Sequence, residues 1–392
     1  MKLNLSDPVL VAMGPPSLTS GWGSYQFPSI NKSDDGVLVV TFNDCADSET
    51  AYGAEPRCMV SSDGGKSWSQ DRLGNYPHLG VKLPNGERVS FPGRPSIPME
   101  GLKLPEPIGV SHLKHTIYAI DEVPSEIVEH TWILRRSSPE NPVGVNEEVT
   151  LGWKDMLIRS CSDVLVRPQP RGRLRLAPDG TLWMPHYYLA GVDPETKAFI
   201  PYLCNYLFKS TDNGRTWEQV NFLPFYPEEI AHPEAQKFEG YGENDVTVTP
   251  DGSLIRLIRT GSNYPCLYTR SDDGGKTWSK PTEFDNHGVW PCLLTLKCGT
   301  TIATYGRPGV WLRATSDPSG IDWDEPIEIV HSDGFKEPSR ESVLVRATCG
   351  YTNLIALNDH TAGLIYSDFR VRDEEGNPRK CIMFRTVTVV ED

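Results

Sequence analysis

The sequence predicts an all-β repeat protein, and three observations indicate this fold class. An eight-residue pattern, Ser-x-Asp-x-Gly-x-Ser/Thr-Trp, occurs at 61–68, 210–217 and 271–278, with a stretched copy at 315–323. Six further segments consist of two apolar runs that flank a turn of the Asp/Asn-Gly type. With 34 Gly and 33 Pro in 392 residues and no long amphipathic helix pattern, the composition divides the chain into many short elements. Recurring copies of this kind predict a repeat architecture.

The eight-residue pattern suits a tight hairpin. Its Asp carboxylate can accept backbone N–H groups across the turn, its Gly supplies a positive φ, and its Trp covers the turn. We therefore assign Asp63, Asp212 and Asp273 to turn formation and not to calcium binding. The pattern resembles the Asp-box of the sialidase superfamily, and this resemblance implies a β-propeller.

The six turn segments predict the number of blades. Five carry glycine at the turn position and the sixth carries histidine: Gly36, Gly86, Gly180, Gly252, Gly299 and His360. We therefore expect an all-β, six-bladed β-propeller with Asp-box hairpins, in which residues 1–392 form a single domain. Blade two carries a proline-rich insertion at about 91–130, which we expect to form loops and a short helix over one face.

Composition restricts the partners and the compartment. The formal net charge of −14 disfavours nucleic acid, because phosphate binding needs a basic face. The first residues have no apolar run typical of a signal peptide, and no stretch approaches the ~20 apolar residues of a membrane span. Nine Cys without a CxxC spacing indicate reduced thiols. We expect a cytoplasmic protein without a membrane, metal or cofactor; its oligomeric state is not predicted.

Counting residues from each turn locates equivalent positions on the strands before and after it. Nine residues before the turns stand Phe27, Pro77, Arg171, Glu243, Trp290 and Tyr351, with Gln26 and His78 beside two of them. Seven or eight residues after the turns stand Arg94, Arg259 and Arg307, with Tyr187 and Tyr188 in blade three. Because the first strand of each blade lines the channel of a propeller, we expect these side chains to gather at one mouth and form a functional site.

Two segments resemble catalytic segments of the sialidase superfamily. The segment 242–259 resembles the one that carries a catalytic Glu and, one hairpin later, a carboxylate-binding Arg, which implies these roles for Glu243 and Arg259. Gly350-Tyr351 resembles the segment of the nucleophilic Tyr, and Arg307 stands where the last arginine of the family's triad would fall.

The pairing of a phenol with a carboxylate is chemically coherent. A phenol with a pKa near 10 is a poor nucleophile at neutral pH unless a base such as Glu243 takes its proton. A neutral nucleophile suits a sugar whose anomeric carbon bears a carboxylate. An anionic Asp or Glu at ~4 Å would cost about 4 kcal/mol at an effective dielectric of about 20. Arginines bind such a carboxylate through bidentate hydrogen bonds.

The chain departs from the family pattern at two positions. Gln26 stands where the family has its first arginine, and Asp368 follows Tyr366 where the family has a bracing Glu. The two changes fit together, because a bracing carboxylate without its arginine would be an unpaired buried charge. Arg94 or Arg171 could supply the missing charge.

The general acid is expected in the loop between the second strand of blade one and the first Asp-box. This loop holds three carboxylates, of which Asp47 is preferred for its distance from Ser61, with Glu49 and Asp44 as alternatives. The expected substrate-binding residues are Arg259, Arg307, Arg94, Arg171, Gln26, His78, His186 and Trp290.

These features predict an exo-acting, retaining glycoside hydrolase of the sialidase-like type, with Tyr351 as nucleophile, Glu243 as its base and Asp47 as acid. Its substrate is a carbohydrate with an acidic sugar, either sialic acid or a related keto-deoxy or uronic sugar. Two other classes remain open. One is a polysaccharide lyase on a propeller scaffold, in which Tyr351 or a His removes the proton α to a uronate carboxylate. The other is a non-catalytic propeller that binds a glycan or a protein.

Overall fold

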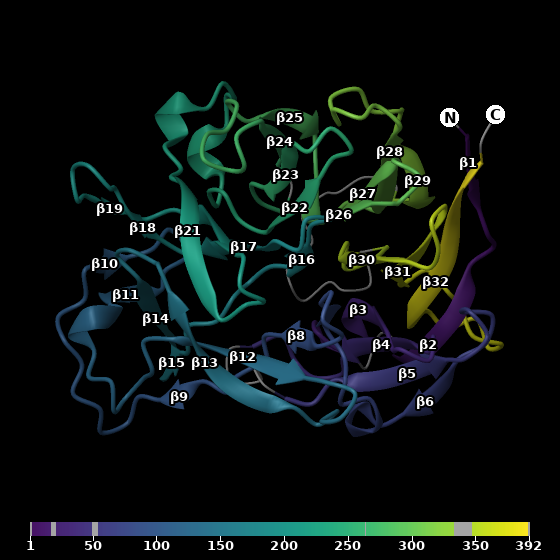
Figure 1. Cartoon of the computed structure of the whole chain (residues 1–392), viewed down its shortest axis with the longest axis horizontal. Coiled ribbons are helices and arrows are strands. Elements are labelled where there is room, and N and C mark those ends of the chain that lie inside the picture. The colour runs from purple at the N-terminus through teal and green to yellow at the C-terminus, as the bar shows by residue number, and fades with distance from the viewer. Residues whose placement is uncertain (1, 17–20, 49–53, 263, 333–346, 391–392) are drawn as a thin grey trace.

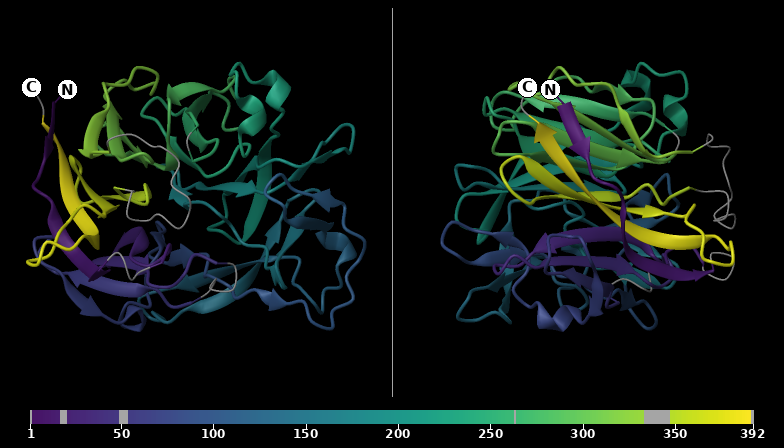
Figure 2. Two further views of the ribbon diagram at one scale, coloured as in Figure 1. Left: turned by 180° about the vertical axis from the view of Figure 1, so that it is seen from behind. Right: turned by 90° about the vertical axis from the view of Figure 1, so that its right-hand side faces the viewer.

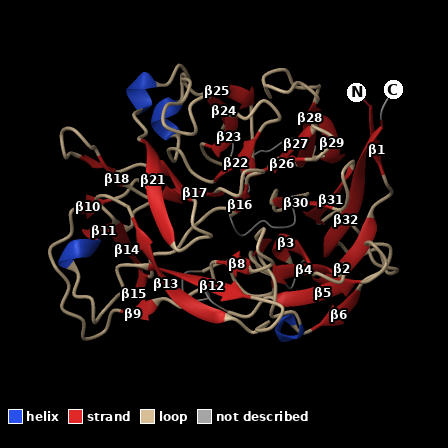
Figure 3. Cartoon of the chain, in the orientation of Figure 1, coloured by secondary structure: helices blue, strands red, loops and turns tan. Residues whose placement is uncertain are grey.

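Six blades of antiparallel strands surround a central axis in the computed structural model (Figure 1). Blades two and three are joined in one eight-stranded sheet, because their outer strands pair in parallel at Thr150 and Thr216. The structure describes residues 2–16, 21–48, 54–262, 264–332 and 347–390. Strands and loops make up almost all of this part of the chain, and its helices are short 3-10 turns (Figure 3). The predicted all-β, six-bladed propeller is confirmed.

Each blade contains three or four strands from one continuous stretch of chain, apart from the insertion in blade two and the closure of blade six. Blade one comprises β3 (Gln26–Lys32), β4 (Leu38–Asn43), β5 (Arg57–Ser61) and β6 (Ser69–Asp71). Blade two comprises β7 (Val81–Lys82), β8 (Arg88–Ser90), β12 (Trp132–Ser137) and β13 (Val145–Leu151). Blade three comprises β16 (Arg175–Leu176), β17 (Leu182–Tyr188), β20 (Cys204–Ser210) and β21 (Thr216–Leu223).

The second half of the ring repeats this arrangement. Blade four comprises β22 (Asn244–Val248), β23 (Leu254–Arg259), β24 (Cys266–Ser271) and β25 (Thr282–Asp285). Blade five comprises β26 (Val289–Thr295), β27 (Thr301–Gly306), β28 (Val310–Thr315) and β29 (Ile327–Val330). Blade six comprises β30 (Thr352–Ala356), β31 (Thr361–Asp368) and β32 (Arg379–Val390).

The two ends of the chain meet in blade six. Strands β1 (Lys2–Leu5) and β2 (Val9–Pro16) both pair antiparallel with the long strand β32. Figure 2 shows these N-terminal strands beside β32, with the two termini close together. This pairing joins the two ends of the chain within one blade, and it covers the edge of β32 with backbone hydrogen bonds from the first residues. The assignment of residues 1–392 to a single domain stays a prediction.

The six predicted turns join the first and second strands of the six blades. The five glycines at the turn position have φ between 87° and 90°, a conformation that side chains with a Cβ rarely adopt. This explains why glycine recurs there. The turn at His360 makes its bend without a positive φ at that residue within the described structure.

The Asp-box hairpins form the predicted bonds. In the second copy, Asp212 Oδ1 accepts the amide N–H groups of Arg215 and Thr216, both at 2.9 Å. Trp217 Nε1 donates to the carbonyl of Gly214 at 3.0 Å. The other two regular copies repeat these bonds, and the stretched copy closes on its tryptophan in the same way, at 2.9 Å. The box carboxylates are therefore turn formers.

The insertion in blade two differs from the prediction of loops and a short helix. It contains β9 (Ile97–Pro98), β10 (Gly109–Val110), β11 (Thr116–Ala119) and a single 3-10 turn, Ile120–Glu122. These strands join β14 (Leu157–Cys161) and β15 (Val164–Val166) in a five-stranded sheet in the order β10-β11-β14-β15-β9, which we call the insertion sheet. It lies at the left-hand edge of Figure 1, away from the chain termini. Because about forty residues separate β11 from β14, no local turn motif in the sequence predicts that these two strands pair.

Candidate active site

Tyr351 and Glu243 are in direct contact, although they lie in blades six and four. The Tyr351 hydroxyl donates a hydrogen bond to Glu243 Oε1. Arg259 Nη1 donates to Glu243 Oε2 at 2.9 Å and lies 3.5 Å from Tyr351 Oη. The backbone N–H of Trp290 donates to Glu243 Oε2 at 3.0 Å. Both carboxylate oxygens therefore have fixed donors, and one of these donors is a phenol.

Arg259 and Arg307 converge on a single hydroxyl. Arg259 Nη2 lies 3.3 Å and Arg307 Nη1 lies 2.9 Å from Ser262 Oγ. Arg259 Nη2 also contacts Glu239 at 3.1 Å, and Arg307 Nη2 donates to the carbonyl of Cys349 at 2.9 Å. Two guanidinium groups within reach of one neutral oxygen form an arrangement that an anionic ligand would stabilise.

The electrostatics keep the proton on the phenol. Burial and the adjacent Glu243 carboxylate raise the pKa of Tyr351 well above its ordinary value. Burial opposes ionisation of Glu243, which is 6% exposed, but the charge of Arg259 and the hydrogen bond from Tyr351 outweigh it and lower its pKa. Burial, together with the charge of Arg259, lowers the pKa of Arg307. The resting pair is therefore a neutral phenol and a carboxylate.

Three residues surround the Tyr351 ring, and all three have left-handed backbone conformations. Trp290 (φ 43°) stacks on it with ring centroids 5.2 Å apart and an interplanar angle of 17°. Phe27 (φ 55°) meets it edge-on at 4.7 Å, and the guanidinium of Arg307 (φ 58°) lies 5.9 Å from its centroid. Such conformations cost about 1–3 kcal/mol each and persist where the surroundings impose them.

Bulges produce two of these conformations. The register of β3 with β4 shifts between Gln26 and Ser29, which leaves Phe27 unpaired in the ladder. The register of β26 with β27 shifts between Val289 and Cys292, around Trp290. A bulge turns a side chain away from its regular alternation, and here it turns both aromatic rings towards Tyr351.

Gly350 brings Tyr351 close to Arg307. Its φ is 80°, and a Cβ at this position would lie 2.9 Å from Arg307 N and 3.0 Å from Val289 Cγ2. A side chain would therefore collide with the neighbouring blade. Glycine is required here for a close backbone approach as well as for its φ.

A cavity of about 670 Å³ opens beside the Tyr351–Glu243 pair. The propeller residues that line it are Asp47, Ser48, Arg171, Tyr187, Leu189, Leu203, Glu239, Gly242, Glu243, Arg259 and Tyr351. The insertion sheet supplies the rest of the lining. The cavity therefore brings together Tyr351, Glu243, Asp47, Arg259 and Arg171, which come from four separate segments of the sequence.

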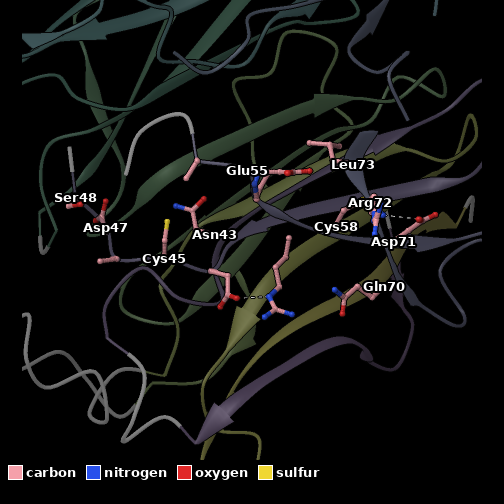
Figure 4. A pocket seen from close by; sticks show the side chains of 15 residues that line it. Asn43, Cys45, Asp47, Ser48, Glu55, Cys58, Gln70, Asp71, Arg72 and Leu73 are labelled. Carbon is pink, nitrogen blue, oxygen red and sulfur yellow. Dashed lines mark hydrogen bonds and ion pairs between the residues drawn. The ribbon is translucent and has the colours of Figure 1, made fainter. Parts of the chain in front are cut away.

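Asp47 is connected to the site through Trp22. Trp22 Nε1 donates to Asp47 Oδ2 at 3.1 Å, and the guanidinium of Arg307 lies 5.4 Å from the Trp22 ring. Asp47 and Ser48 also line a second cavity, of about 500 Å³, which Figure 4 shows between them and Gln70 of β6. Asp47 is therefore exposed and lines both cavities.

The two alternative acids differ in their position. Asp44 is bound to Arg57 at 2.5 Å and accepts a hydrogen bond from Ser24 at 3.0 Å, and it lines only the second cavity. Glu49 lies outside the described residues. Among the described loop residues, Asp47 is therefore the carboxylate at the Tyr351 cavity.

The comparisons with known proteins agree with this architecture. The family model of the BNR repeat-like domain matches residues 162–367, more than half of the chain. The chain belongs to the BNR repeat-like family. No curated protein matches the sequence.

Among solved structures, a protein of unknown function from Dyadobacter fermentans is 16% identical over 99% of each chain, with a TM-score of 0.62. This likeness shows the fold. A Hadza microbial sialidase is 15% identical, with a TM-score of 0.48 over 91% of this chain and 65% of that chain. An α-L-arabinanase from Penicillium chrysogenum is 16% identical, with a TM-score of 0.47 over 97% of this chain and 98% of that chain.

Several predicted substrate-binding residues of this BNR repeat-like chain lie away from the 670 Å³ cavity, and these expectations need correction. His186 is 1% exposed in an aromatic cluster, and burial, helped by the charge of Arg171, lowers its pKa to about 3. His78 contacts Ser137 at 2.6 Å and Asp34 at 3.2 Å. Their polar contacts are structural.

Gln26 and Arg94 also lie outside the cavity lining. Gln26 is fully buried, because the bulge in β3 turns Phe27 and not Gln26 towards Tyr351. Arg94 forms an ion pair with Glu129 at 2.8 Å, within the insertion. Arg94 therefore does not supply the positive charge that Gln26 lacks. Arg171, the other candidate for this charge, does line the cavity.

Trp290 and Arg307 contact Tyr351 without lining that cavity. Trp290 instead lines a cavity of about 550 Å³ in the channel, and the guanidinium of Arg173 lies 4.9 Å from its ring. Arg173 donates to the carbonyls of Pro291 at 2.7 Å and Thr352 at 2.6 Å. Its side chain thus supports the stack beneath Tyr351 from blade three.

Sequence reasoning missed Glu239, Trp22, Arg159 and Arg173. Glu239 stands four residues before Glu243, but its partner Arg259 becomes evident only from the hairpin geometry.

The two bulges did have a recognisable sequence signal. Prolines follow Phe27 and Trp290, and proline inside a strand is confined to edges and bulges.

The described residues contain no cluster of three or more His, Cys, Asp or Glu with metal-binding geometry. No helix in the described part of the chain is long and apolar enough to cross a membrane. The nine cysteines are free thiols.

Proposed function

We propose that this protein is a retaining glycoside hydrolase of the sialidase-like type, acting on a glycan with an acidic sugar. One observation supports this most strongly: the hydroxyl of Tyr351 donates to the buried Glu243 carboxylate at the edge of a cavity that also holds Arg259 and Asp47. A phenol held by a base is an activated nucleophile.

In the first step, Tyr351 Oη attacks the anomeric carbon while its proton passes to Glu243. Asp47, in its protonated form, gives its proton to the departing glycosidic oxygen. In the second step, Asp47 takes a proton from a water molecule, whose oxygen attacks the same carbon. The bond to Tyr351 Oη breaks, and Glu243 returns the proton to the phenol, so both carboxyl groups regain their starting states.

The arginines favour an acidic sugar as the substrate. Arg259 and Arg307 share Ser262, and both have hydrogens that could reach a ligand carboxylate near Tyr351. A carboxylate ligand would also relieve the mutual repulsion of the two guanidinium groups. A neutral phenol avoids the repulsion that an anionic nucleophile would meet there.

The test is a screen of aryl glycosides of sialic acid, related keto-deoxy acids, uronic acids and rhamnose, followed by two substitutions. Tyr351→Phe and Glu243→Gln should each abolish hydrolysis while the melting temperature stays nearly unchanged. Tyr305→Phe is the matched control, since Tyr305 of blade five is also buried and donates to a carboxylate, Asp285 of blade four, at 2.6 Å.

Other outcomes would contradict the proposal. Full activity in both substituted proteins would refute the assigned mechanism. An unsaturated product that absorbs in the ultraviolet would indicate a lyase, and an absence of turnover on the whole panel would indicate a binding protein.

A further inference from the structure

The insertion sheet forms a second wall of the Tyr351 cavity. Its contribution comes from two hairpin tips, one between β10 and β11 and one between β14 and β15, together with the adjoining strand ends. The lining residues are Leu113, Lys114, His115, Arg159, Cys161 and Ser162. Because Thr116 of β11 pairs with Ser160 of β14, both tips lie at the same end of the sheet.

The first tip is held rigidly against the propeller. Ser111 N–H donates to the His115 carbonyl at 2.9 Å, and Lys114 N–H donates to the Ser111 carbonyl at 2.8 Å, with Lys114 at φ 66°. His112 N–H donates to the carbonyl of Pro201 at 2.5 Å, and its ring stacks on Tyr202 at 5.0 Å. The tip therefore has a defined position beside the cavity.

The polar groups on this wall are hydrogen-bond donors. Arg159 is 2% exposed, and its Nη1 lies 3.3 Å from His115 Nδ1. Ile117 is the cross-strand partner of Arg159, so His115 lies diagonal to Arg159 on the same face. Since arginine only donates, His115 Nδ1 accepts, and the imidazole proton resides on Nε2. The wall thus contains a guanidinium, an imidazole and the ammonium of Lys114.

The charges of the cavity are divided between the two walls. The carboxylates in its described lining, Asp47, Glu239 and Glu243, all belong to the propeller. The six described lining residues of the insertion sheet include no carboxylate. Two of the three propeller carboxylates are bound to Arg259. A cationic wall in a chain with a formal net charge of −14 points to an anionic ligand.

We propose that Arg159, His115 and Lys114 form a subsite for an anionic group, a carboxylate or a sulfate, on a second unit of the bound glycan. This subsite is separate from the arginines at Tyr351. That the ligand is a glycan rests on the function proposed above. The preferred substrate therefore carries at least two anionic groups, one for each wall.

Binding to the full-length Tyr351→Phe protein tests this subsite, because the proposed function predicts that this protein does not turn over the ligand. The probe is a glycan array with carboxylated, sulfated and neutral oligosaccharides, and the best ligands are measured by calorimetry. Arg159→Gln should weaken glycans with two or more anionic groups about tenfold, the loss of one charge-assisted contact, and neutral or singly charged glycans less than twofold. Comparing the carboxylated with the sulfated glycans of the array identifies which anion the subsite binds.

Three further variants guard against a purely structural effect. Arg159→Lys should restore part of the affinity, because it keeps the charge. Lys114→Asn, at an exposed position where asparagine tolerates the left-handed backbone, should weaken the same glycans. Arg167→Gln removes an equal charge directly after β15, where Arg167 pairs with Glu129 outside the cavity, and should leave binding unchanged.

The proposal is overturned if no anionic glycan binds, or if Arg159→Gln weakens charged and neutral glycans equally. Its failure is separable from failure of the proposed reaction. A selective effect of Arg159 would stand even if Tyr351→Phe retained hydrolysis. Conversely, Tyr351-dependent hydrolysis without any effect of Arg159 on charged ligands would leave the reaction and remove the subsite.

Discussion

Tyr351, Glu243 and Arg259 form one electrostatic unit in which each residue sets the protonation of another. Burial would favour a neutral Glu243 carboxyl, and the charge of Arg259 prevents this. Burial would also lower the pKa of Arg259, but Glu239 and Glu243 reverse the effect and raise it well above its ordinary value. Glu243 is therefore ionised at neutral pH and available to accept a proton.

Removing the charge of Arg259 should raise the pKa of Glu243, because burial would then act unopposed. In Arg259→Gln, the acidic limb of the kcat/KM–pH profile should move to higher pH, whereas in Arg259→Lys it should move less. The profile on the best aryl glycoside from the screen checks this. An unshifted acidic limb would show that Glu243 is not the titrating base.

The lowered pKa of Glu243 in the native protein also affects stability. The pKa of Glu243 is lower in the folded protein than in the unfolded chain, so its contribution to stability is present above the unfolded value. This contribution is lost as the pH falls through the folded value. Protonation of Glu243 in acid is therefore expected to lower both the activity and the stability of the protein.

At the level of strands, paired bulges determine how the Tyr351 ring is held. Phe27 in β3 and Trp290 in β26 leave the regular alternation of their strands, and each precedes a proline. Both rings contact Tyr351, and Arg173 supports Trp290 from the channel. The bulges position the phenol and do not take part in the reaction.

Shortening either aromatic side chain should therefore loosen Tyr351. Trp290→Leu and Phe27→Leu should lower kcat by up to roughly a hundredfold while KM changes little, because misplacement of a reacting group by about 1 Å costs that much. Trp311→Leu, in the third strand of blade five, is the control. Steady-state kinetics check the prediction, and a rise in KM at constant kcat would mean that these rings bind the substrate instead.

The Asp-box hairpins make a separate prediction about acid stability. Hydrogen bonds from the Thr277 backbone and hydroxyl lower the pKa of Asp273 to about 2. Its stabilising contribution should be fully present above the unfolded pKa near 4 and lost between about pH 4 and pH 2. Urea unfolding at pH 7 and pH 3 should therefore differ less for Asp273→Asn than for the native protein. An equal difference in the two proteins would contradict this.

Local signals predicted the hairpins better than the insertion. The turns at Gly36, Gly86, Gly180, Gly252 and Gly299 were identified because a positive φ demands glycine at each of them. The insertion sheet was missed because β11 and β14 pair across about forty residues, which include β12 and β13, and no single hairpin turn joins them. Gln26 was misplaced because counting residues assumes regular alternation, which the bulge at Phe27 breaks.

For the whole molecule, the ring brings together side chains that are far apart in the sequence. Asp47 comes from blade one, Arg171 from the entry to blade three, Glu243 and Arg259 from blade four, and Tyr351 from the entry to blade six. Counting residues from the turns predicted this convergence for Arg171, Glu243, Arg259 and Tyr351, because equivalent strands end at the same mouth, whereas Asp47 was assigned from its loop before the first Asp-box. It did not predict the cationic wall, since the insertion sheet has no counterpart in the other blades.

The central claim is that Tyr351 forms a covalent bond to the sugar, and trapping that bond tests it most directly. A fluorinated derivative of the best glycoside from the screen slows the second step, and mass spectrometry of the digested protein then locates the adduct. We expect one sugar attached to the peptide that contains Tyr351, and none in Tyr351→Phe. Turnover without any adduct, or an adduct on Glu243 or Asp47, would contradict the account.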